Sequence, residues 1–300
     1  MPHEPTLTRE ISPLPDRDDD AHKGDVGRLC VVGGCSGHCL MVGAVALAAN
    51  AAQRSGTGLV QMFVPEGIRA SVTVLAPCAT CRVLPTETEA LLAAVGAYHA
   101  DVVAIGPGLG DSLAAATVAD VIERMPTAIV VDADALNRLA EVASADQGGS
   151  AARFDPARVV LTPHPGEAAR LLRAKGLETP ASSDAGSRKQ AAIALQQAYG
   201  GTIVFKGAAT IVTNGTRLYV NETGNSGMAT GGTGDVLTGM IAGLIGQSME
   251  PFEAAILAAY LHGLAGDFAA GELGRWSMTA FDLIDFLPEA FCEYDATEGV

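Results

Sequence analysis

The sequence predicts an α/β fold: a mostly parallel central sheet of about eight strands, helices on both faces and a late antiparallel hairpin. Short apolar runs alternate with longer segments of helical periodicity, which is typical of parallel strands covered on both faces. The 35 glycines and the low aromatic content of 5% suit closely packed helices. Asn214-Gly215 stands between two β-branched runs, which favours a hairpin there.

Eight short apolar runs predict strands. In chain order they are Leu29–Gly33, Leu59–Val64, Val102–Ile105, Ala128–Val131, Val159–Leu161, Thr202–Phe205, Thr210–Val212 and Leu218–Val220. Nine segments with apolar residues at helical spacing predict helices. They are Val42–Arg54, Thr88–Ala97, Leu113–Glu123, Ala135–Ala143, Gly166–Ala174, Ser187–Tyr199, Val236–Gly246, Phe252–Ala270 and Ala280–Ala290. Thr279-x-x-Asp282 is a capping-box pattern for the last of them.

The strand–helix alternation continues without a break, so we expect one domain over residues 24–300, preceded by a polar, flexible leader over residues 1–23. A net charge of −15 argues against nucleic-acid and anionic-membrane partners. The longest apolar run, Leu40–Ala49, is too short to span a bilayer, and the first twenty residues do not resemble a signal peptide. We therefore expect a soluble, cytoplasmic protein.

Residues 224–235 carry five glycines and end in Gly232-Thr233-Gly234-Asp235, directly before a predicted helix. A glycine-rich turn that leads into a helix N-terminus directs free N–H groups and a partial positive charge at one spot, which favours phosphate binding. The amides of Gly232, Thr233 and Gly234 could then stabilise a moving phosphoryl group, and Asp235 could take the proton of the attacking hydroxyl. The alternative is that Asp235 only caps the helix.

Other familiar sites are absent from the sequence or weak in it. The chain has neither a P-loop nor a nucleophile elbow, and Gly106-Pro-Gly108-Leu-Gly110 has the wrong spacing for a dinucleotide fingerprint. Cys35-x3-Cys39 and Cys78-x2-Cys81 could in principle bind zinc, but we favour their interpretation as small apolar or half-exposed residues.

Polar motifs follow five of the predicted strands. They are Gly33-Gly34-Cys35-Ser36, Gly106-Pro-Gly108, Asp132-Ala-Asp134, Thr162-Pro-His164-Pro-Gly166-Glu167 and Lys206-Gly207-Ala208. Ligands of open α/β sheets bind at the carboxyl ends of the strands. Together with the glycine-rich turn, these motifs predict a long rim that can hold two ligands.

With these motifs in this order, the chain resembles the ribokinase-like superfamily, and within it the ADP-dependent NAD(P)H-hydrate dehydratases, over about residues 20–290. Thr162-Pro-His-Pro-Gly-Glu167 and Gly227-Met-Ala-Thr-Gly-Gly-Thr-Gly-Asp235 are the specific segments. The resemblance implies a three-layer sandwich. It also implies that phosphate passes from ADP, or ATP, to the C6 hydroxyl of hydrated NADH or NADPH and is then eliminated, with Mg²⁺ as cofactor.

The resemblance also implies site residues. The substrate half would include Ala44, Gly108, His164 and Asp235. The nucleotide half would include Lys206, Gly207, Ala208, Ala209, Thr210 and Gly234. Glu167 is a candidate to hold Mg²⁺ through water, or a first-turn carboxylate favoured by the helix dipole. Asp132 is either a metal-side residue or a loop cap, and we favour a cap for Asp134.

Two other functions stay open from the residues: a kinase for a vitamin precursor, which would share Asp235 and the anion turn, and a nucleotide-binding sensor without turnover. The resemblance further implies a homo-oligomer, a tetramer. The fused epimerase domain of some relatives is absent from this sequence, so we expect cooperation with a separate NAD(P)H-hydrate epimerase.

Overall fold

The computed structural model describes residues 4–37, 39–145, 153–178 and 184–298. Its main sheet has ten strands in the order β1-β12-β11-β10-β9-β8-β7-β2-β5-β6. Their bounds are β1 Thr6–Leu7, β2 Arg28–Val32, β5 Leu59–Val64, β6 Thr80–Val83, β7 Val102–Ile105, β8 Ala128–Val131, β9 Val159–Leu161, β10 Thr202–Phe205, β11 Ile211–Thr213 and β12 Arg217–Val220. Strand β11 runs antiparallel to both neighbours, and the other pairings in this sheet are parallel. The predicted mostly parallel sheet is confirmed.

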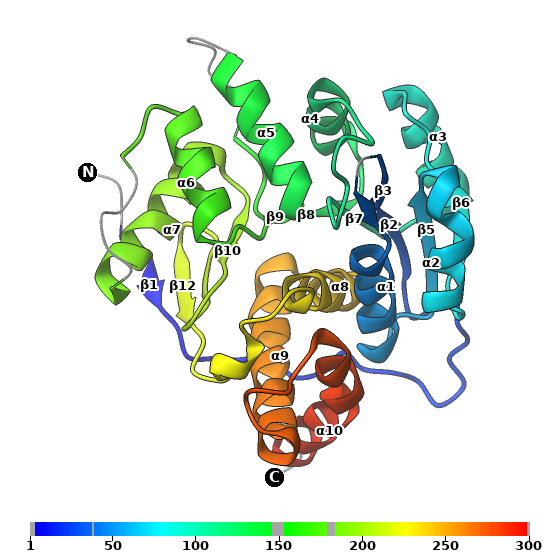
Figure 1. Ribbon diagram of the computed structural model, residues 1–300. Coiled ribbons are helices and arrows are strands. Elements are labelled where there is room, and N and C mark those ends of the chain that lie inside the picture. The colour runs from blue at the N-terminus through cyan, green and yellow to red at the C-terminus, as the bar shows by residue number, and fades with distance from the viewer. Residues whose placement is uncertain (1–3, 38, 146–152, 179–183, 299–300) are drawn as a thin grey trace.

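Helices cover both faces of the sheet, as predicted, and form a three-layer sandwich (Figure 1). One face packs against α1 Gly43–Arg54, α2 Arg69–Leu75, α8 Thr233–Gly246, α9 Pro251–Leu273 and α10 Ala280–Glu298. The other packs against α3 Thr88–Tyr98, α4 Ala115–Arg124, α5 Ala133–Ala145, α6 Pro165–Ala174 and α7 Ala185–Tyr199. Each face has its own large apolar cluster, which follows from strands that are buried on both sides.

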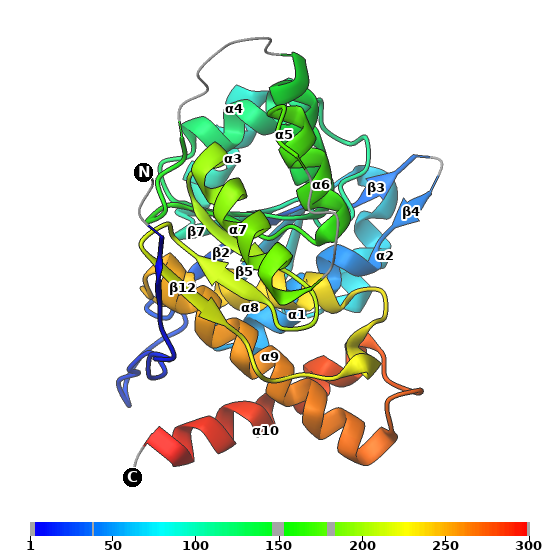
Figure 2. The same cartoon turned by 90° about the vertical axis from the view of Figure 1, so that its left-hand side faces the viewer.

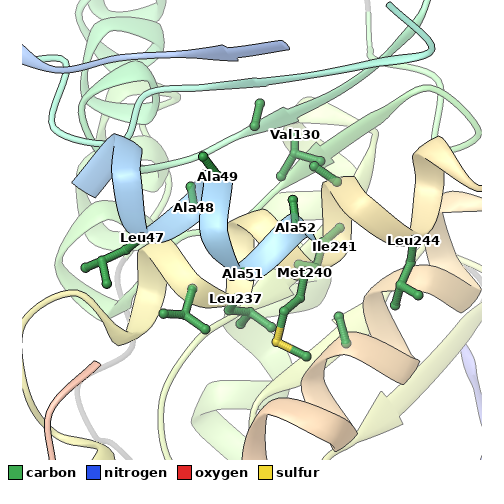
Figure 3. Packing of buried hydrophobic residues seen from close by; sticks show 14 of the residues in the cluster. Leu47, Ala48, Ala49, Ala51, Ala52, Val130, Leu237, Met240, Ile241 and Leu244 are labelled. Atoms are coloured by element: carbon green, nitrogen blue, oxygen red, sulfur yellow. The ribbon is translucent and has the colours of Figure 1, made fainter. Parts of the chain in front are cut away.

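Helices α1 and α8 pack unusually closely because small residues meet at their contact (Figure 3). A Cβ added to Gly239 would lie 2.1 Å from the carbonyl oxygen of Ala48, and one added to Gly243 would lie 3.1 Å from that of Ala52. Leu237, Met240, Ile241 and Leu244 fill the space around these alanines (Figure 3). This packing fixes the N-terminus of α8 at the carboxyl end of the sheet.

The predicted hairpin is present: β11 and β12 pair in antiparallel register around Asn214-Gly215, and Gly215 has φ +92°. Asn214 Oδ1 accepts from the backbone N–H groups of Thr216, at 3.0 Å, and Arg217, at 2.9 Å. The predicted cap of α10 is also present, since the Thr279 N–H donates to Asp282 Oδ2 at 2.7 Å. Both turns therefore follow from local side-chain chemistry.

The sheet exceeds the predicted eight strands because two edge strands, β1 and β6, lack an apolar run. Strand β6 is largely exposed and reads Thr-Cys-Arg-Val, so its sequence carries little strand signal. Strand β1 lies within the segment expected to be a leader, whose first three residues are outside the described residues. Ser12 Oγ of that segment donates to Glu253 at 3.0 Å, and Figure 2 shows the segment along one side of the molecule.

A further hairpin was not predicted. Residues Cys35–Ser36 (β3) and Leu40–Met41 (β4) form a small antiparallel hairpin. Figure 2 shows it at the end of the molecule where the segment before α8 also lies. By length and composition α9 could cross a membrane, but 67% of its apolar window is buried in the fold, as in the core helix of a soluble protein.

Candidate active site

The glycine turn, residues 229–235, brings the chain into α8. Gly232 is the residue before the helix and has φ +95°, a conformation that favours glycine. The first backbone bond of the helix joins Val236 N–H to the Gly232 carbonyl at 3.1 Å. The N–H groups of Thr233, Gly234 and Asp235 precede that bond and face outward from the N-terminus of the helix, where an anion is favoured. A Cβ on Gly231 would meet nothing within 4 Å.

A buried ion pair lies directly beside this turn. Lys206, which follows β10, donates from Nζ to Asp132 Oδ1 at 2.5 Å. Asp132 is only 1% exposed and also accepts from Thr162 Oγ1 and Thr238 Oγ1, both at 2.8 Å. This carboxylate thus joins the ends of β8, β9 and β10 to helix α8. These contacts give Asp132 a structural role between the sheet and α8, which differs from the loop cap considered from the sequence.

Lys206 stays protonated despite its burial. Burial alone would lower its pKa, but the carboxylates of Asp132, Glu167 and Asp235 raise it above the ordinary value overall. A Cβ added to Gly234 would lie 3.2 Å from Lys206 Nζ, so the ammonium stands over the glycine turn. It is therefore a fixed positive charge at the predicted phosphate position.

Asp235 lies in the first turn of α8 and is half-buried. Burial raises its pKa to about 7, Asp132, Asp134 and Glu167 add to the rise, and Lys206 opposes it. A carboxyl group that titrates near neutral pH exchanges a proton readily with a hydroxyl under physiological conditions. Asp235 can therefore act as a general base.

His164 and Glu167 form the capping box at the start of α6. His164 Nδ1 accepts from Gly166 N–H at 2.9 Å, and Glu167 Oε2 accepts from His164 N–H at 2.8 Å. Glu167 Oε1 lies 3.1 Å from His164 Nε2. Glu167 is 4% exposed, whereas the imidazole of His164 is 49% exposed. His164 therefore has a structural role as a cap and still presents a face to a ligand.

The predicted substrate half is built by close approach of three segments. Gly108 has φ +58°, and a Cβ on it would meet those of Met41 and Ala44 at 3.0 and 3.1 Å. Asp134 Oδ2 accepts from Gly110 N–H at 2.8 Å, which makes Asp134 a loop cap. Leu47 lies one turn along α1 from Ala44. A Cβ added to Gly232 would lie 2.6 Å from Leu47 Cδ1, so Leu47 packs against the glycine turn. Helix α1 therefore links this half to the glycine turn.

The predicted nucleotide segment, residues 206–210, leaves the end of β10 as an exposed loop. Gly207 has φ +133° and the non-glycine Ala209 has φ +54°. Thr210 Oγ1 closes the loop by donating to the Gly207 carbonyl at 3.0 Å. Ala208 is exposed beside them. The loop therefore presents backbone groups to solvent at the carboxyl end of the sheet.

Sequence reasoning missed three residues that surround this region. Arg188 of α7 stacks 4.5 Å above the Phe205 ring and donates to the Lys206 carbonyl at 3.3 Å. Thr238 and His262 reach the site from α8 and α9. All three lie inside helices. Polarity within an apolar segment could have marked Thr238 and His262, but Arg188 stands in a polar stretch of α7 where no signal marks it.

Four carboxylates and one ammonium influence each other here, yet they do not form a metal cage. Within the part of the chain that the structure describes, no group of three His, Cys, Asp or Glu side chains has the arrangement to hold a metal ion. Cys35, which belongs to one of the two cysteine pairs considered as zinc ligands, donates from Sγ to Asp111 Oδ1 at 3.1 Å. A divalent ion at this site would depend on oxygens supplied by a ligand.

Comparison with known proteins places these features in a family. The family profile described as NAD(P)H-hydrate dehydratase matches residues 29–289. The chain is 42% identical over 291 residues to the bifunctional NAD(P)H-hydrate repair enzyme Nnr of Moorella thermoacetica, covering 92% of this chain and 51% of that protein. It is 39% identical over 252 residues to the ADP-dependent (S)-NAD(P)H-hydrate dehydratase of Neisseria meningitidis, covering 84% and 80%. The chain spans about half the length of the bifunctional relatives it matches.

Solved structures agree with these matches. The ADP/ATP-dependent NAD(P)H-hydrate dehydratase of Bacillus subtilis, co-crystallized with ATP/Mg²⁺, superposes with a TM-score of 0.71 at 29% identity, covering 94% of this chain and 95% of that one. A ribokinase-like superfamily protein of Enterococcus faecalis superposes with a TM-score of 0.73 at 27% identity, covering 94% and 92%. The predicted ribokinase-like fold is thereby confirmed.

Proposed function

Because the chain belongs to the NAD(P)H-hydrate dehydratase family of ribokinase-like proteins, we propose that it catalyses the nucleotide-dependent dehydration of hydrated NADH or NADPH, a metabolite-repair reaction. One observation carries the proposal most directly. Asp235, a carboxyl group whose pKa is raised to about 7, follows a turn of outward N–H groups over which Lys206 stands. A proton acceptor beside an anion site is what phosphorylation of a hydroxyl requires.

In this proposal Asp235 takes the proton of the C6 hydroxyl as its oxygen attacks the terminal phosphorus of the nucleotide. The N–H groups of Gly232, Thr233, Gly234 and Asp235 and the ammonium of Lys206 stabilise the charge on the transferred group. The bond from phosphorus to the leaving phosphate oxygen breaks, which gives AMP when ADP is the donor. The phosphate on C6 then leaves with its bonding electrons, and loss of a ring proton restores the dihydronicotinamide. Phosphate is a far better leaving group than hydroxide.

The two ligands would meet across the glycine turn. Support comes from the sheet order: residues 206–210 follow β10, whereas Gly108, which lies against Ala44, follows β7, and His164 follows β9 between them. The nucleotide would lie along the former and the hydrated cofactor along the latter. Such an arrangement lets donor and hydroxyl approach in line.

Mg²⁺ is the proposed cofactor, and the residues fit it only as an ion carried by the phosphates. Glu167 uses each carboxylate oxygen once, toward His164, which leaves lone pairs for metal-bound water. Magnesium commonly takes one or two carboxylates together with substrate phosphates and waters. Bound there, it would neutralise phosphate charge.

The donor, partners and location are further parts of the proposal. We propose ADP or ATP as donor, since the Neisseria relative is described as ADP-dependent and the Bacillus one as ADP/ATP-dependent. Cooperation with an NAD(P)H-hydrate epimerase and a homo-tetrameric state rest on the family resemblance, and the bifunctional relatives support the former. The cytoplasmic location rests on the sequence pattern of the first twenty residues and of the apolar runs.

The proposal is tested by incubating the protein with hydrated NADH, Mg²⁺ and either ADP or ATP. We expect the near-ultraviolet absorbance of dihydronicotinamide to return, with AMP formed in equal amount when ADP is used. Asp235→Asn is the control and should leave the absorbance unchanged. A stable phosphorylated product from a hydroxymethyl vitamin precursor would favour the kinase alternative instead, and nucleotide binding without any product would favour a sensor.

A further inference from the structure

The glycine turn has little conformational restraint of its own. Three of its seven residues are glycine, whose backbone is the least restricted of all. Thr233 Oγ1 donates to the carbonyls of Met228, at 3.2 Å, and Thr230, at 3.1 Å, but both bonds stay within the same segment. Among the described residues, the hydrogen bond that ties the turn to another element comes from His262 of α9.

His262 Nε2 lies 2.9 Å from the backbone carbonyl oxygen of Thr233. A carbonyl oxygen only accepts, so the ring must carry its proton on Nε2. Burial lowers the pKa of His262 to about 4, and the nearby Lys206 ammonium lowers it further, against the effect of the bond to Thr233. At physiological pH the imidazole is thus neutral, with Nε2 as its donor.

Helix α9 also holds the segment that leads to the turn. Thr223 Oγ1 donates to the Tyr260 carbonyl at 2.8 Å, and Asp267 Oδ2 accepts from Gly224 N–H at 2.8 Å. Asn225 Nδ2 donates to the Gly266 carbonyl, also at 2.8 Å. Residues 223–233 therefore lie along α9, attached at several points, and His262 makes the attachment nearest Asp235.

We propose that His262 is a positioning residue: by donating from Nε2 to the Thr233 carbonyl, it fixes the orientation of the Gly234 and Asp235 N–H groups and of the Asp235 carboxyl. The expected effect of His262 on kcat rests on the proposed function, but its expected effect on the order of the turn does not. A turn oriented in advance stabilises the transferred phosphoryl group without reorganising during the reaction. His262 acts through Thr233 and does not need to touch either ligand.

Three variants test this role. His262→Leu removes the donor and keeps an apolar side chain, whereas His262→Gln keeps an amide donor at a reach similar to Nε2. Leu261→Ala is the matched control, because Leu261 is a fully buried neighbour on α9, and its truncation destabilises the core without removing the bond to Thr233.

The first measurement is hydrogen–deuterium exchange of the Val236 amide, whose bond to Gly232 begins helix α8. We expect exchange to be about fivefold faster in His262→Leu, and close to wild type in His262→Gln. Leu261→Ala should accelerate exchange of the Val236 amide no more than it accelerates exchange of the other amides of α8. Unaltered exchange at Val236 in His262→Leu would overturn the proposal, whatever reaction the protein catalyses.

The second measurement is kinetic. In His262→Leu we expect kcat to fall roughly 10- to 100-fold with KM for the nucleotide nearly unchanged, and His262→Gln to recover most of the loss. Equal losses in His262→Leu and Leu261→Ala at matched stability would refute a positioning role. If the wild-type protein is inactive on hydrated NADH, the proposed function fails, and the exchange experiment still decides whether His262 holds the turn.

Discussion

Lys206 and Gly234 face each other across the site: the point where a side chain on Gly234 would begin lies 3.2 Å from the Lys206 ammonium. Glycine at this position therefore keeps open the space between a fixed positive charge and the N-terminus of α8. The positive φ of the turn is found two residues earlier, at Gly232. The requirement for glycine at 234 is thus one of space and not of backbone conformation.

Gly234→Val should weaken nucleotide binding much more than it destabilises the fold. The β-branched side chain would fill the space beneath Lys206, while the helical backbone conformation remains accessible to valine. We expect affinity for ADP, measured by calorimetry, to fall by at least about tenfold. Gly271→Ala, at an open position of α9, is the control and should not alter it. Wild-type affinity in Gly234→Val would show that phosphate binds elsewhere.

Asp235→Asn should fold and bind nucleotide but lose activity by a factor on the order of 10² to 10⁴. The base works as carboxylate, so activity should rise with pH through the raised pKa. We expect kcat/KM of the wild type to increase about tenfold per pH unit below pH 7 and to level off above pH 7. Asp120→Asn, on the exposed surface of α4, is the control. A profile that is flat between pH 5.5 and 8 would contradict the assignment of the base.

The same carboxyl should make the protein less stable as pH rises. The folded state holds a proton on Asp235 up to about pH 7, whereas the unfolded chain releases it near 3.8, so the native state binds more protons in between. The stabilisation is complete below pH 3.8 and is lost as pH rises through 7. The change in the free energy of unfolding caused by Asp235→Asn should therefore be more favourable at pH 8 than at pH 4. The difference between the two pH values should be at most about 4 kcal/mol. Urea unfolding at both values checks this, and a pH-independent effect would argue against a raised pKa.

Asp132→Ala should be severely destabilising, by about 3–5 kcal/mol, because it leaves the Lys206 ammonium buried without its counter-charge. Thr238→Val removes only one of the three hydrogen bonds to the same carboxylate and should cost about 1 kcal/mol. Denaturant unfolding of both variants measures the difference. Equal losses would mean that the ion pair contributes no more than a neutral contact.

His164→Asn separates the two roles of His164. Asparagine is a good N-cap residue, so this variant should retain the stability of α6, whereas His164→Ala should lose about 1 kcal/mol. We expect KM for the hydrated cofactor to rise about tenfold in both variants if a ligand hydrogen bond is lost. Unchanged kinetics in His164→Asn would reduce His164 to a helix cap.

Much of the fold was predictable because periodicity is strong where strands are buried on both sides. The central strands β7 and β8 were placed residue for residue, and the antiparallel step followed from Asn214-Gly215. The edge strand β6 and helix α2 escaped prediction, since one is largely exposed and the other spans only seven residues. Short, solvent-facing elements depend on tertiary contacts that no local pattern records.

The candidate site was predictable where a motif follows a strand, as at Lys206, or leads into a helix, as at Asp235. It was not predictable where a contact crosses between distant segments. Asp132 and Thr238 are separated by 106 positions, and the hydrogen bond between them follows from the packing of α8 on the sheet. The capping contacts of His164 were likewise missed, because histidine is not among the usual N-cap residues.

The contact between α1 and α8 has a consequence for motion. With Gly239 pressed against the Ala48 carbonyl, neither helix can slide or tilt without a backbone collision. Sliding of α8 along α1 is therefore disfavoured as a way of admitting ligands, and the two helices form a fixed base for the glycine turn.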